Sequence, residues 1–319
     1  MEKNSNIYVA GHHGLVGSAI VKKLQAEGYC NLLYKTHKEL DLCRQDPVEK
    51  FFIQSKPEYV IMAAAKVGGI LANSSYPADF IYQNILIQSN IIHSAYLAGV
   101  KKLLFLGSSC IYPRLCPQPM KEEYLLSGAL EPTNEPYAIA KIAGIKMCQA
   151  YNKQYGTHFI SAMPTNLYGP GDNFDLETSH VIPALIRKFL EAKTRAESKS
   201  DPSAINSVTI LGTGTPLREF LHVDDLADAC VFLMNRYDES NIINIGVGQE
   251  IRIHDLALLI KEITGFAGAL KFDPSKPDGT PRKLLDIDRL SALGWRAHVP
   301  LREGLKSTYR WFQEQYSAS

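Results

Sequence analysis

Three side chains in the middle of this chain could act together on a carbonyl group. Tyr137 and Lys141 are four residues apart, and Ser108 precedes them. A phenol is a poor acid near neutrality because its free pKa is about 10, but a neighbouring ammonium stabilises the phenolate and brings the group towards a working range. A serine hydroxyl could hydrogen-bond the same carbonyl oxygen. These residue types predict proton transfer to or from a carbonyl.

An apolar run of strand length leads to Ser108. The run extends from Lys101 to Leu106, so Ser108 would lie where a strand ends. Alternation along the strand would point Cys110 to the same side as Ser108. Two reactive side chains would then share one wall of a site, although Cys110 taken alone is equally compatible with a packed thiol.

A helix is predicted from Glu135 to Tyr151, and it carries the other two reactive side chains. Asn134 is a candidate cap and Pro136 suits the first turn. Residues four apart lie on one helix face, so Tyr137 and Lys141 would be neighbours. A tyrosine and a lysine at this spacing are often only solvated, so the pair is informative only with the other motifs.

A glycine pattern at the start of the chain could hold a nucleotide. The short strand Asn6–Ala10 is followed by Gly11, Gly14 and Gly17, and a helical pattern then runs from Ser18 to Glu27. Glycines let the backbone turn tightly and approach a pyrophosphate, whose charge a helix N-terminus favours. The alternative is a tight turn that binds no ligand.

A basic cluster follows the second predicted strand, Cys30–Tyr34. NAD-binding proteins of this architecture usually have an acid here for the ribose hydroxyls. Lys35, His37 and Lys38 instead suit a ribose 2′-phosphate, so we predict NADP as the cofactor. Solvation of three basic side chains in a surface loop is the alternative.

Strands and helices continue to alternate through the middle of the chain. A third strand is predicted over Pro57–Ala65, and Gly68 and Gly69 follow it, where small residues would let a dinucleotide cross the edge of the sheet. The helix Tyr82–Ala98 and the strand His158–Met163 extend the pattern. This alternation predicts an α/β fold with a doubly wound, Rossmann-like parallel sheet.

The composition becomes more polar after residue 172, where we place a domain boundary. Residues 1–172 would form the NADP-binding domain, with a returning segment near 222–246, and residues 173–319 a smaller C-terminal α/β substrate-binding domain. Thr194–Ser207 has low hydrophobicity and is predicted to be a mobile loop.

Three helices are predicted in this second half. An amphipathic helix opens at His180, and others run from Val223 to Arg236 and from Ile253 to Thr264. Asp224 is interpreted as a structural cap and not as a catalytic acid. The sequence shows no internal repeat.

The bulk composition limits the class of function. The 319 residues carry a net charge of +1 and no block of like charges, which argues against nucleic acid or a membrane surface as a partner. No apolar run approaches the ~20 residues needed to span a bilayer, and we expect a soluble, cytoplasmic protein. The cysteines lack metal-ligand spacing, so no metal site is predicted. Apart from Cys110, we expect them to be small buried side chains: Cys30, Cys43, Cys116, Cys148 and Cys230.

These motifs together resemble the short-chain dehydrogenase/reductase family. The stretch from Leu211 to Asp225 resembles the signature of its extended branch, which acts on nucleotide sugars, and Arg218 is the expected diphosphate contact. A surface salt bridge is the alternative for Arg218. The resemblance also implies a homodimer. The cofactor contacts that it implies are Gly11, His13, Gly14, Leu15, Val16, Gly17, Lys35, His37, Lys38, Asp41, Leu42, Ala64, Leu106, Gly107, Ser108, Tyr137, Lys141, Pro164, Thr165, Asn166, Leu167 and His180.

The longer runs, such as Gly-Ser-Ser-Cys-Ile-Tyr-Pro, resemble members that epimerise C3 and C5 of a GDP-4-keto-6-deoxy sugar and then reduce C4 with NADPH. A 4-ketone acidifies the hydrogens on both neighbouring carbons. The resemblance implies that Cys110 is the base, that His180 is the acid, and that the charge of Lys141 favours a thiolate. A capping or core histidine is the alternative for His180. The implied contacts to the GDP-sugar substrate are Lys188, Leu211, Arg218 and Asp278.

Three positions depart from better-known bacterial members of that group. His13 and Lys188 stand where those members have Arg, and Leu211 stands where they have Trp. Two rival functions stay open. One is another reductase or 4-epimerase of nucleotide sugars, in which Cys110 and His180 would be incidental, and the other is a non-catalytic NADP sensor.

Overall fold

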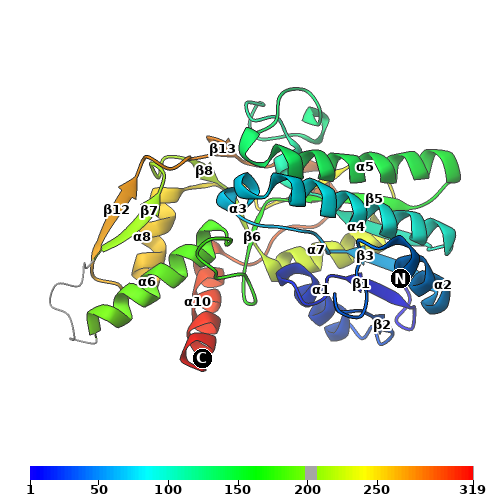
Figure 1. The fold of residues 1–319 in the computed structure, drawn as a ribbon, viewed down its shortest axis with the longest axis horizontal. Coiled ribbons are helices and arrows are strands. Elements are labelled where there is room, and N and C mark those ends of the chain that lie inside the picture. Colours follow the sequence, from blue (N-terminus) through cyan, green and yellow to red (C-terminus); the bar gives the residue numbers. More distant parts are fainter. Residues whose placement is uncertain (198–206, 319) are drawn as a thin grey trace.

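The computed structural model describes residues 1–197 and 207–318 of the chain. At the centre of this described part of the chain is a six-stranded sheet with the strand order β10-β5-β4-β3-β1-β2 (Figure 1). Every neighbouring pair is parallel, so the carboxyl ends of the strands meet at one edge. The prediction of a doubly wound, Rossmann-like sheet is confirmed. The strands are β1 (Ile7–Ala10), β2 (Leu32–Leu33), β3 (Tyr59–Met62), β4 (Lys102–Leu106), β5 (Phe159–Pro164) and β10 (Ile243–Ile245).

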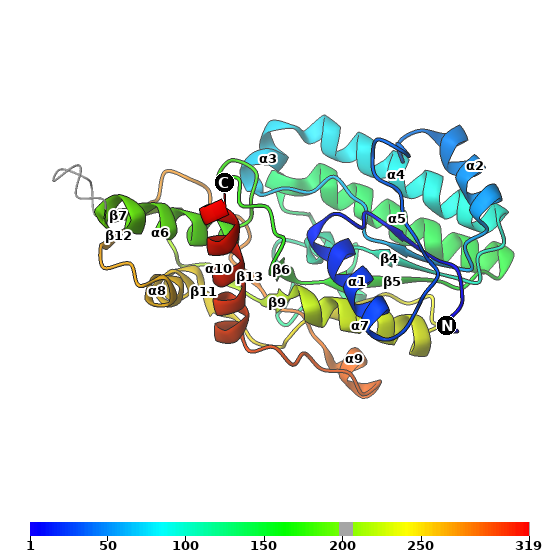
Figure 2. The same cartoon turned by 90° about the horizontal axis from the view of Figure 1, so that it is seen from below.

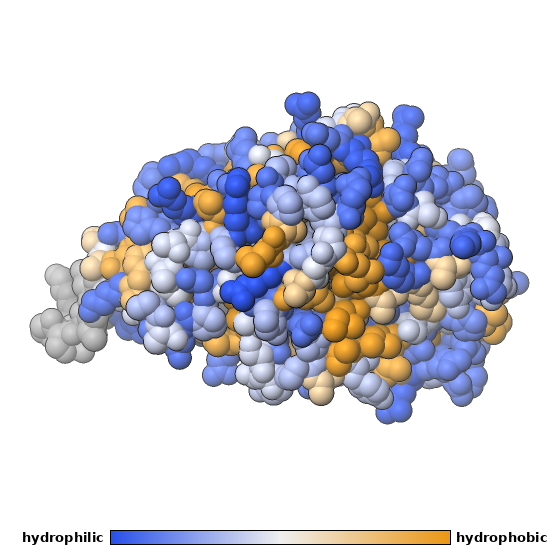
Figure 3. Space-filling model, turned by 90° about the horizontal axis from the view of Figure 1, so that it is seen from above, coloured by the Kyte–Doolittle hydropathy of each residue, from blue (hydrophilic) through white to orange (hydrophobic). Residues whose placement is uncertain are grey.

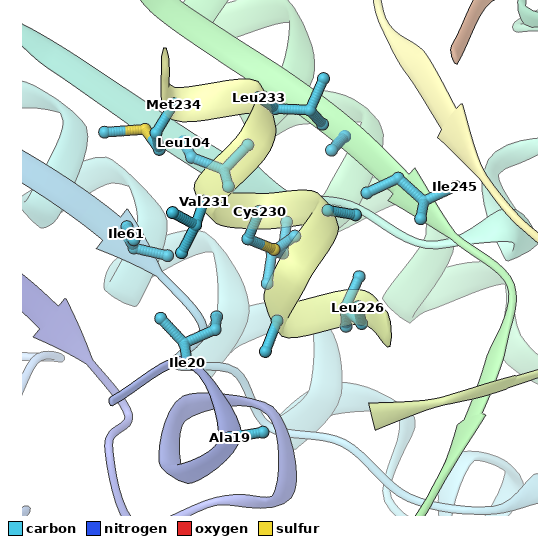
Figure 4. Close-up of a cluster of buried hydrophobic side chains, with 14 of the residues drawn as sticks. Ala19, Ile20, Ile61, Leu104, Leu226, Cys230, Val231, Leu233, Met234 and Ile245 are labelled. Atoms are coloured by element: carbon cyan, nitrogen blue, oxygen red, sulfur yellow. The ribbon is translucent and has the colours of Figure 1, made fainter. Parts of the chain in front are cut away.

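Helices cover both faces of the sheet. Successive side chains of a strand point to opposite faces, and both sets are apolar here, so both faces must be covered. Ile7 and Val9 of β1 pack towards α1 (Leu15–Ala26) and α7 (Val223–Arg236), as Figure 4 shows for neighbouring residues of that cluster. Tyr8 instead belongs to the cluster on the other face. The helices that contribute to that cluster are α2 (Gln45–Ser55), α4 (Pro77–Leu97) and α5 (Glu135–Tyr155).

The remaining elements build a smaller body with its own apolar cluster, at the left of Figure 1. Figure 2 shows α10 standing where the two bodies meet. The helices here are α6 (Val181–Glu197), α8 (Ile253–Thr264) and α10 (Leu301–Ala318). The strands are β7 (Ser207–Leu211), β8 (Leu217–Arg218), β11 (Ile251–Arg252), β12 (Ala269–Asp273) and β13 (Arg282–Lys283).

Short elements connect these parts. They are α3 (Ile70–Ser75), α9 (Asp288–Ala292), β6 (Asn166–Tyr168), β9 (Phe220–His222) and the 3-10 turns η1 (Ser109–Ile111), η2 (Glu122–Tyr124) and η3 (Pro132–Asn134). Within the part of the chain that the structure describes, no helix combines the length and apolar character needed to cross a membrane.

Several predicted elements lie where expected but have different bounds. The helix α1 begins at Leu15 and not at Ser18, because the glycine turn enters the helix directly after Gly14. The helix α4 begins at Pro77, five residues before the predicted start, since proline is favoured in a first helical turn. The helices α2 and α10 were not predicted individually from the sequence.

Two local predictions were wrong. The N-terminal cap of α7 is His222, whose Nδ1 accepts the hydrogen bond of the Asp224 backbone N–H at 3.3 Å, so Asp224 itself is not the cap. Of the loop predicted over Thr194–Ser207, the first residues continue α6 to Glu197 and Ser207 opens β7. Residues 198–206 lie outside the described part of the chain.

The cysteines differ in exposure more than the sequence indicated. Cys148 and Cys230 are buried as expected, whereas Cys43 and Cys116 are half-buried and Cys30 is exposed. Cys30 lies just before β2, near the N-terminal segment, where its thiol donates to the carbonyl of Lys3 at 3.4 Å.

Candidate active site

Two clefts open along the carboxyl edge of the sheet, with volumes of about 700 Å³ and 290 Å³. The larger follows the glycine turn and the ends of β2, β3, β4 and β5, and the smaller lies between that edge and the C-terminal body. β2 lies on one side of β1 and β3 on the other, so the connections leave β1 in opposite directions. Open α/β sheets bind ligands at this switch point between β1 and β3. The residues that line both clefts include Gly68, Asn73, Asn134, Asn166, Leu167, Ser179, His180 and Lys283.

The glycine turn is shaped for a close approach between backbone and ligand. Gly11 has φ +84°, and a Cβ on it would lie 2.8 Å from the backbone of Ala64. A Cβ on Gly17 would lie 2.1 Å from the carbonyl oxygen of Gly11, so the helix can start only if this residue is glycine. No described side chain caps α1, whose N-terminus faces the larger cleft. These features fit a pyrophosphate group.

The far end of the larger cleft fits an adenosine with a 2′-phosphate. Lys35, His37, Asp41 and Leu42 line it. The Asp41 carboxylate accepts the backbone N–H of Cys43 at 3.0 Å, and the loop is tied to α4 by a further side-chain hydrogen bond to the carbonyl of Leu42. The lining therefore combines positive charge with a rigid loop, as a phosphorylated ribose requires.

Ser108 and Tyr137 meet at the end of β4. Ser108 accepts a hydrogen bond from the N–H of Cys110 at 3.4 Å, and its hydroxyl lies close enough to hydrogen-bond the Tyr137 phenol. Burial raises the pKa of Tyr137 well above its usual range, the nearby Cys110 adds to this, and Ser108 opposes it. The ring of Phe80 contacts the Tyr137 ring edge-on, with centroids 6.2 Å apart. The phenol therefore holds its proton firmly in the free protein.

Lys141 lies behind Tyr137 and does not line either cleft. Its ammonium donates to the carbonyl of Leu106 at 2.8 Å and stands 5.7 Å from the centre of the Tyr137 ring. Burial lowers the pKa of Lys141 to about 8. The sequence-based argument that Lys141 would bring the phenol pKa down does not describe the free protein, in which burial of the phenol dominates.

Cys110 lies on the same wall as Ser108, but not through strand alternation. The chain leaves β4 and enters η1, and this turn places the thiol beside Tyr137 and Lys141. Burial raises the pKa of Cys110, while the charge of Lys283, the hydrogen bond with Ser108 and the charge of Lys141 act in the opposite direction. Lys283 is thus the strongest electrostatic support for a thiolate, ahead of the Lys141 named from the sequence.

His180 stands at the junction of the two clefts, immediately before α6. Its carbonyl accepts the N–H of Ala184 at 3.1 Å, which places the residue at the start of the helix. Desolvation lowers the pKa of His180, and the charge of Lys283 lowers it further. Protein atoms surround Tyr137, His180 and Lys283, but Tyr137 and Lys283 are only half-buried and His180 is exposed, because all three face the larger cleft.

The expected substrate contacts all line the smaller cleft. The Arg218 guanidinium donates to the carbonyl of Asp278 at 3.1 Å, and burial lowers its pKa to about 10. The Asp278 carboxylate is held by Thr213, through the backbone N–H at 2.8 Å and the hydroxyl at 2.7 Å. Lys188 donates to the carbonyl of Thr209 at 3.0 Å, and Leu211 is exposed at the rim. Two cations beside a polar loop fit a diphosphate.

The chain matches the model of the NAD dependent epimerase/dehydratase family over residues 7–246, which is most of its length. The chain belongs to this family. It is 63% identical over 311 residues to "GDP-L-fucose synthase 1" of Arabidopsis thaliana, covering 98% of this chain and 94% of that protein. The resemblance to the extended short-chain dehydrogenase/reductases is thereby confirmed.

Two solved structures of similar proteins have nearly the same fold. A GDP-L-fucose synthetase from Naegleria fowleri bound to NADP is 30% identical, with a TM-score of 0.90 over 100% of this chain and 97% of that chain. A GDP-mannoheptose C4 reductase from Campylobacter jejuni with NADP bound is 43% identical, with a TM-score of 0.89 over 98% and 99% of the two chains.

Most of the residues that the sequence predicted for catalysis and cofactor binding line the larger cleft. Besides Lys141, the nominated cofactor residues that do not line the larger cleft are His13, Lys38 and Leu106. The sequence argument missed Lys283 and Phe80, which approach the reactive group from β13 and α4. Lys283 reaches the site because β13 pairs in parallel with β8, a long-range contact that leaves no local periodicity.

Proposed function

We propose that the protein is a GDP-L-fucose synthase: it epimerises C3 and C5 of GDP-4-keto-6-deoxy-D-mannose and then reduces the C4 ketone with NADPH. The observation that carries this proposal is that Cys110 and His180 line the same cleft as Ser108 and Tyr137, and that both feel the charge of Lys283. A plain reductase needs only the proton donor Tyr137 and no additional base and acid beside the sugar. The similarity to proteins named GDP-L-fucose synthase supports the same activity.

NADPH fits the larger cleft. The turn around Gly11, Gly14 and Gly17 would take the pyrophosphate, and Lys35 with His37 would take the 2′-phosphate. The bound cofactor supplies the hydride that reduces C4. The similarity to structures that contain NADP supports this choice.

The epimerase steps need a base and an acid on opposite sides of the sugar. The Cys110 thiolate takes the proton from the carbon next to the ketone and becomes a thiol, while Tyr137 and Ser108 hydrogen-bond the enolate oxygen. Protonated His180 then gives a proton to the other face of the carbon and becomes neutral imidazole. Solvent restores both groups before the next carbon reacts. The lowered pKa of His180 makes it a stronger acid in its protonated form.

The reduction step uses Tyr137 as the acid. Its phenol holds a proton at neutral pH and gives it to the C4 oxygen as that oxygen gains negative charge. Ser108 stabilises the same oxygen. Lys141, with its charge behind the ring, stabilises the phenolate that Tyr137 becomes when it gives up its proton, and solvent then restores that proton.

A second candidate function is C4 reduction of another GDP sugar without epimerisation, and the similarity to a GDP-mannoheptose C4 reductase favours it. The decisive experiment incubates the protein with GDP-4-keto-6-deoxy-D-mannose and NADPH in D₂O and identifies the product by NMR. We expect GDP-L-fucose with deuterium at C3 and C5. A product reduced at C4 with both other centres unchanged would favour the second candidate.

The division of the chain, its assembly and its location form part of the proposal. We propose that residues 1–172 and the returning segment 222–246 bind NADP, and that residues 173–319 bind the sugar nucleotide in a cytoplasmic homodimer. Pairing of β10 with β5 supports the return of the chain to the first domain. Apolar side chains gathered over α4 and α5 support a dimer through those helices (Figure 3). Those exposed side chains are Tyr82, Ile85, Leu97, Ile139 and Tyr155.

Lys35→Glu should weaken the preference for NADPH over NADH. The new carboxylate would repel the 2′-phosphate that the lysine attracts, so KM for NADPH should rise roughly tenfold or more, while KM for NADH should change little. Lys38→Glu is the matched control, because Lys38 is exposed and does not line the cleft. Steady-state kinetics with both cofactors provide the test. Equal effects of the two substitutions would contradict the assignment of Lys35.

The two half-reactions should respond to pH in opposite directions. Lys141 is charged below its pKa of about 8 and neutral above it, so reduction should decline as pH rises through this value. Burial raises the pKa of Cys110, so its thiolate becomes more populated as pH rises, and deuterium incorporation should increase towards alkaline pH. Measuring both rates from about pH 6 to 10 tests this. Parallel profiles would show that one shared group limits both steps.

A further inference from the structure

His180 is carried by a loop, residues 173–180, that we call the His180 strap. It joins β6 to α6 and passes between the dinucleotide-binding sheet and the C-terminal body. The backbone N–H of Gly69, just before α3, donates to the carbonyl of Thr178 at 2.9 Å. The strap therefore rests on the segment that follows β3, two residues before His180.

The strap is rigid because the Asp175 carboxylate accepts hydrogen bonds from several N–H and O–H groups within it. Asp175 Oδ1 accepts the N–H of Glu177 at 3.1 Å, the N–H of Thr178 at 3.0 Å and the hydroxyl of Thr178 at 2.8 Å. The carbonyl of Asp175 also accepts the N–H of Ser179 at 2.9 Å. A displacement of Thr178 or Ser179 would therefore also displace His180, which follows them in the chain.

The other end of the strap is fixed to the C-terminal body. Phe174 is buried and stacks on Phe312 of α10, with ring centroids 4.0 Å apart and an interplanar angle of 10°. Arg187 of α6 donates to the carbonyl of Phe174 at 3.1 Å. Since this end cannot yield, the position of His180 depends on how closely the strap approaches Gly69.

Space, and not backbone conformation, requires glycine at position 69. Its φ is −67° and its ψ −178°, which any residue can adopt. A Cβ on Gly69 would lie 2.5 Å from the carbonyl oxygen of Ser179, a distance at which one of the two segments must move. Gly69 itself is held by Asn73 of α3, whose amide donates to the carbonyls of Gly68 at 2.8 Å and Gly69 at 3.0 Å. The end of the strap next to Gly69, around Ser179, is the part that would shift.

We propose that Gly69 is a positioning residue for His180: its missing side chain lets the strap close onto the sheet and sets the distance from the imidazole to the substrate. The proposal rests on the proposed function, in which His180 returns the proton during epimerisation. It gives the pair of glycines after β3 a second role, in addition to making room for a dinucleotide. A displacement of about 1 Å in a proton donor can cost a factor of about 100 in rate.

Gly69→Ala should separate inversion from reduction. With His180 displaced, the Cys110 thiol exchanges its proton with solvent and returns a deuteron to the original face, so the carbon exchanges without inverting. Reduction by NADPH, with Tyr137 as the proton donor, continues. The ratio of GDP-L-fucose to reduced product with uninverted C3 or C5 should fall by a factor on the order of 10 to 100. KM for NADPH should change much less. Product analysis by NMR after reaction in D₂O measures the ratio.

Gly68→Ala is the matched control within the same pair. Its Cβ would meet Ala72 at 3.0 Å and Phe80 at 3.2 Å, but Thr178 only at an ordinary 3.6 Å. It should therefore lower both half-reactions together and leave the product ratio near that of the unmodified protein. If both alanine variants change the ratio equally, crowding of α3 and α4 explains the effect and the proposal fails.

A second variant, Asp175→Ala, tests the same proposal if Gly69→Ala does not fold, because it loosens the strap. Asp175 is exposed, and Asp175→Ala removes the acceptor that fixes Thr178, so the same shift towards uninverted product is expected. An unchanged ratio in the folded variants would overturn the role of Gly69. Absence of GDP-L-fucose with the unmodified protein would instead contradict the proposed function, so the two failures are distinguishable.

Discussion

Replacing Cys110 with alanine should abolish deuterium incorporation at C3 and C5 of the keto sugar while leaving the C4 ketone reducible. A positioned base contributes a factor of about 10² to 10⁴ to proton transfer. Ser108, Tyr137 and Lys141 are unchanged in the variant, so reduction should continue. The main product should be the reduced GDP-6-deoxyhexose without inversion. NMR of the products formed in D₂O with NADPH provides the measurement.

Cys116→Ala is the matched control for this experiment. Cys116 is half-buried and its thiol also feels the charge of Lys283, but it lines neither cleft. Removing it should leave deuterium incorporation within a few-fold of the unmodified rate. GDP-L-fucose formed at a normal rate by Cys110→Ala would contradict the epimerase assignment and favour a plain C4 reductase.

The parts of the fold that were predicted correctly are those with a local signal. The strand–turn–helix around Gly11 depends on residues adjacent in sequence, and a four-residue spacing on a helix puts Tyr137 and Lys141 on one face whatever surrounds them. Bounds were less accurate, as at the start of α4, because the first turn of that helix depends on local proline geometry more than on apolar periodicity.

The parts of the site that were missed depend on contacts between distant segments. Lys283 reaches Cys110 through pairing of β13 with β8, and the strap reaches Gly69 through a single backbone hydrogen bond. Neither contact repeats along the sequence, so no period reveals it. The pKa of Tyr137 was misjudged for a related reason, because burial depends on the surrounding fold and not on which residue is four positions away.

Cys110 shows how an expected position can result from a different path of the chain. Strand alternation was expected to place its thiol beside Ser108, yet β4 ends at Leu106 and the chain turns through η1. The turn brings both groups to one wall because the Ser108 hydroxyl accepts the backbone N–H of Cys110 and so caps the turn.

Tyr137→Phe should lower the rate of C4 reduction by a factor on the order of 100 or more and leave the affinity for NADPH largely intact. The phenol is the proton donor to the reacting oxygen, and its raised pKa keeps it protonated. It takes no part in the adenosine end of the larger cleft, so the cofactor should still bind. Deuterium incorporation should fall less than reduction, because Ser108 can still hydrogen-bond the enolate oxygen and Cys110 remains the base.

Tyr112→Phe is the control that separates loss of chemistry from loss of stability. Tyr112 is buried in the same segment, and its hydroxyl donates to the side-chain oxygen of Asn244. Its removal should lower the melting temperature, because a buried hydrogen bond is lost, without a comparable loss of reduction. The rates are measured with saturating substrate and NADPH, and cofactor binding by fluorescence titration. Normal reduction by Tyr137→Phe would require another acid, and the geometry leaves Ser108 as the residue to replace next.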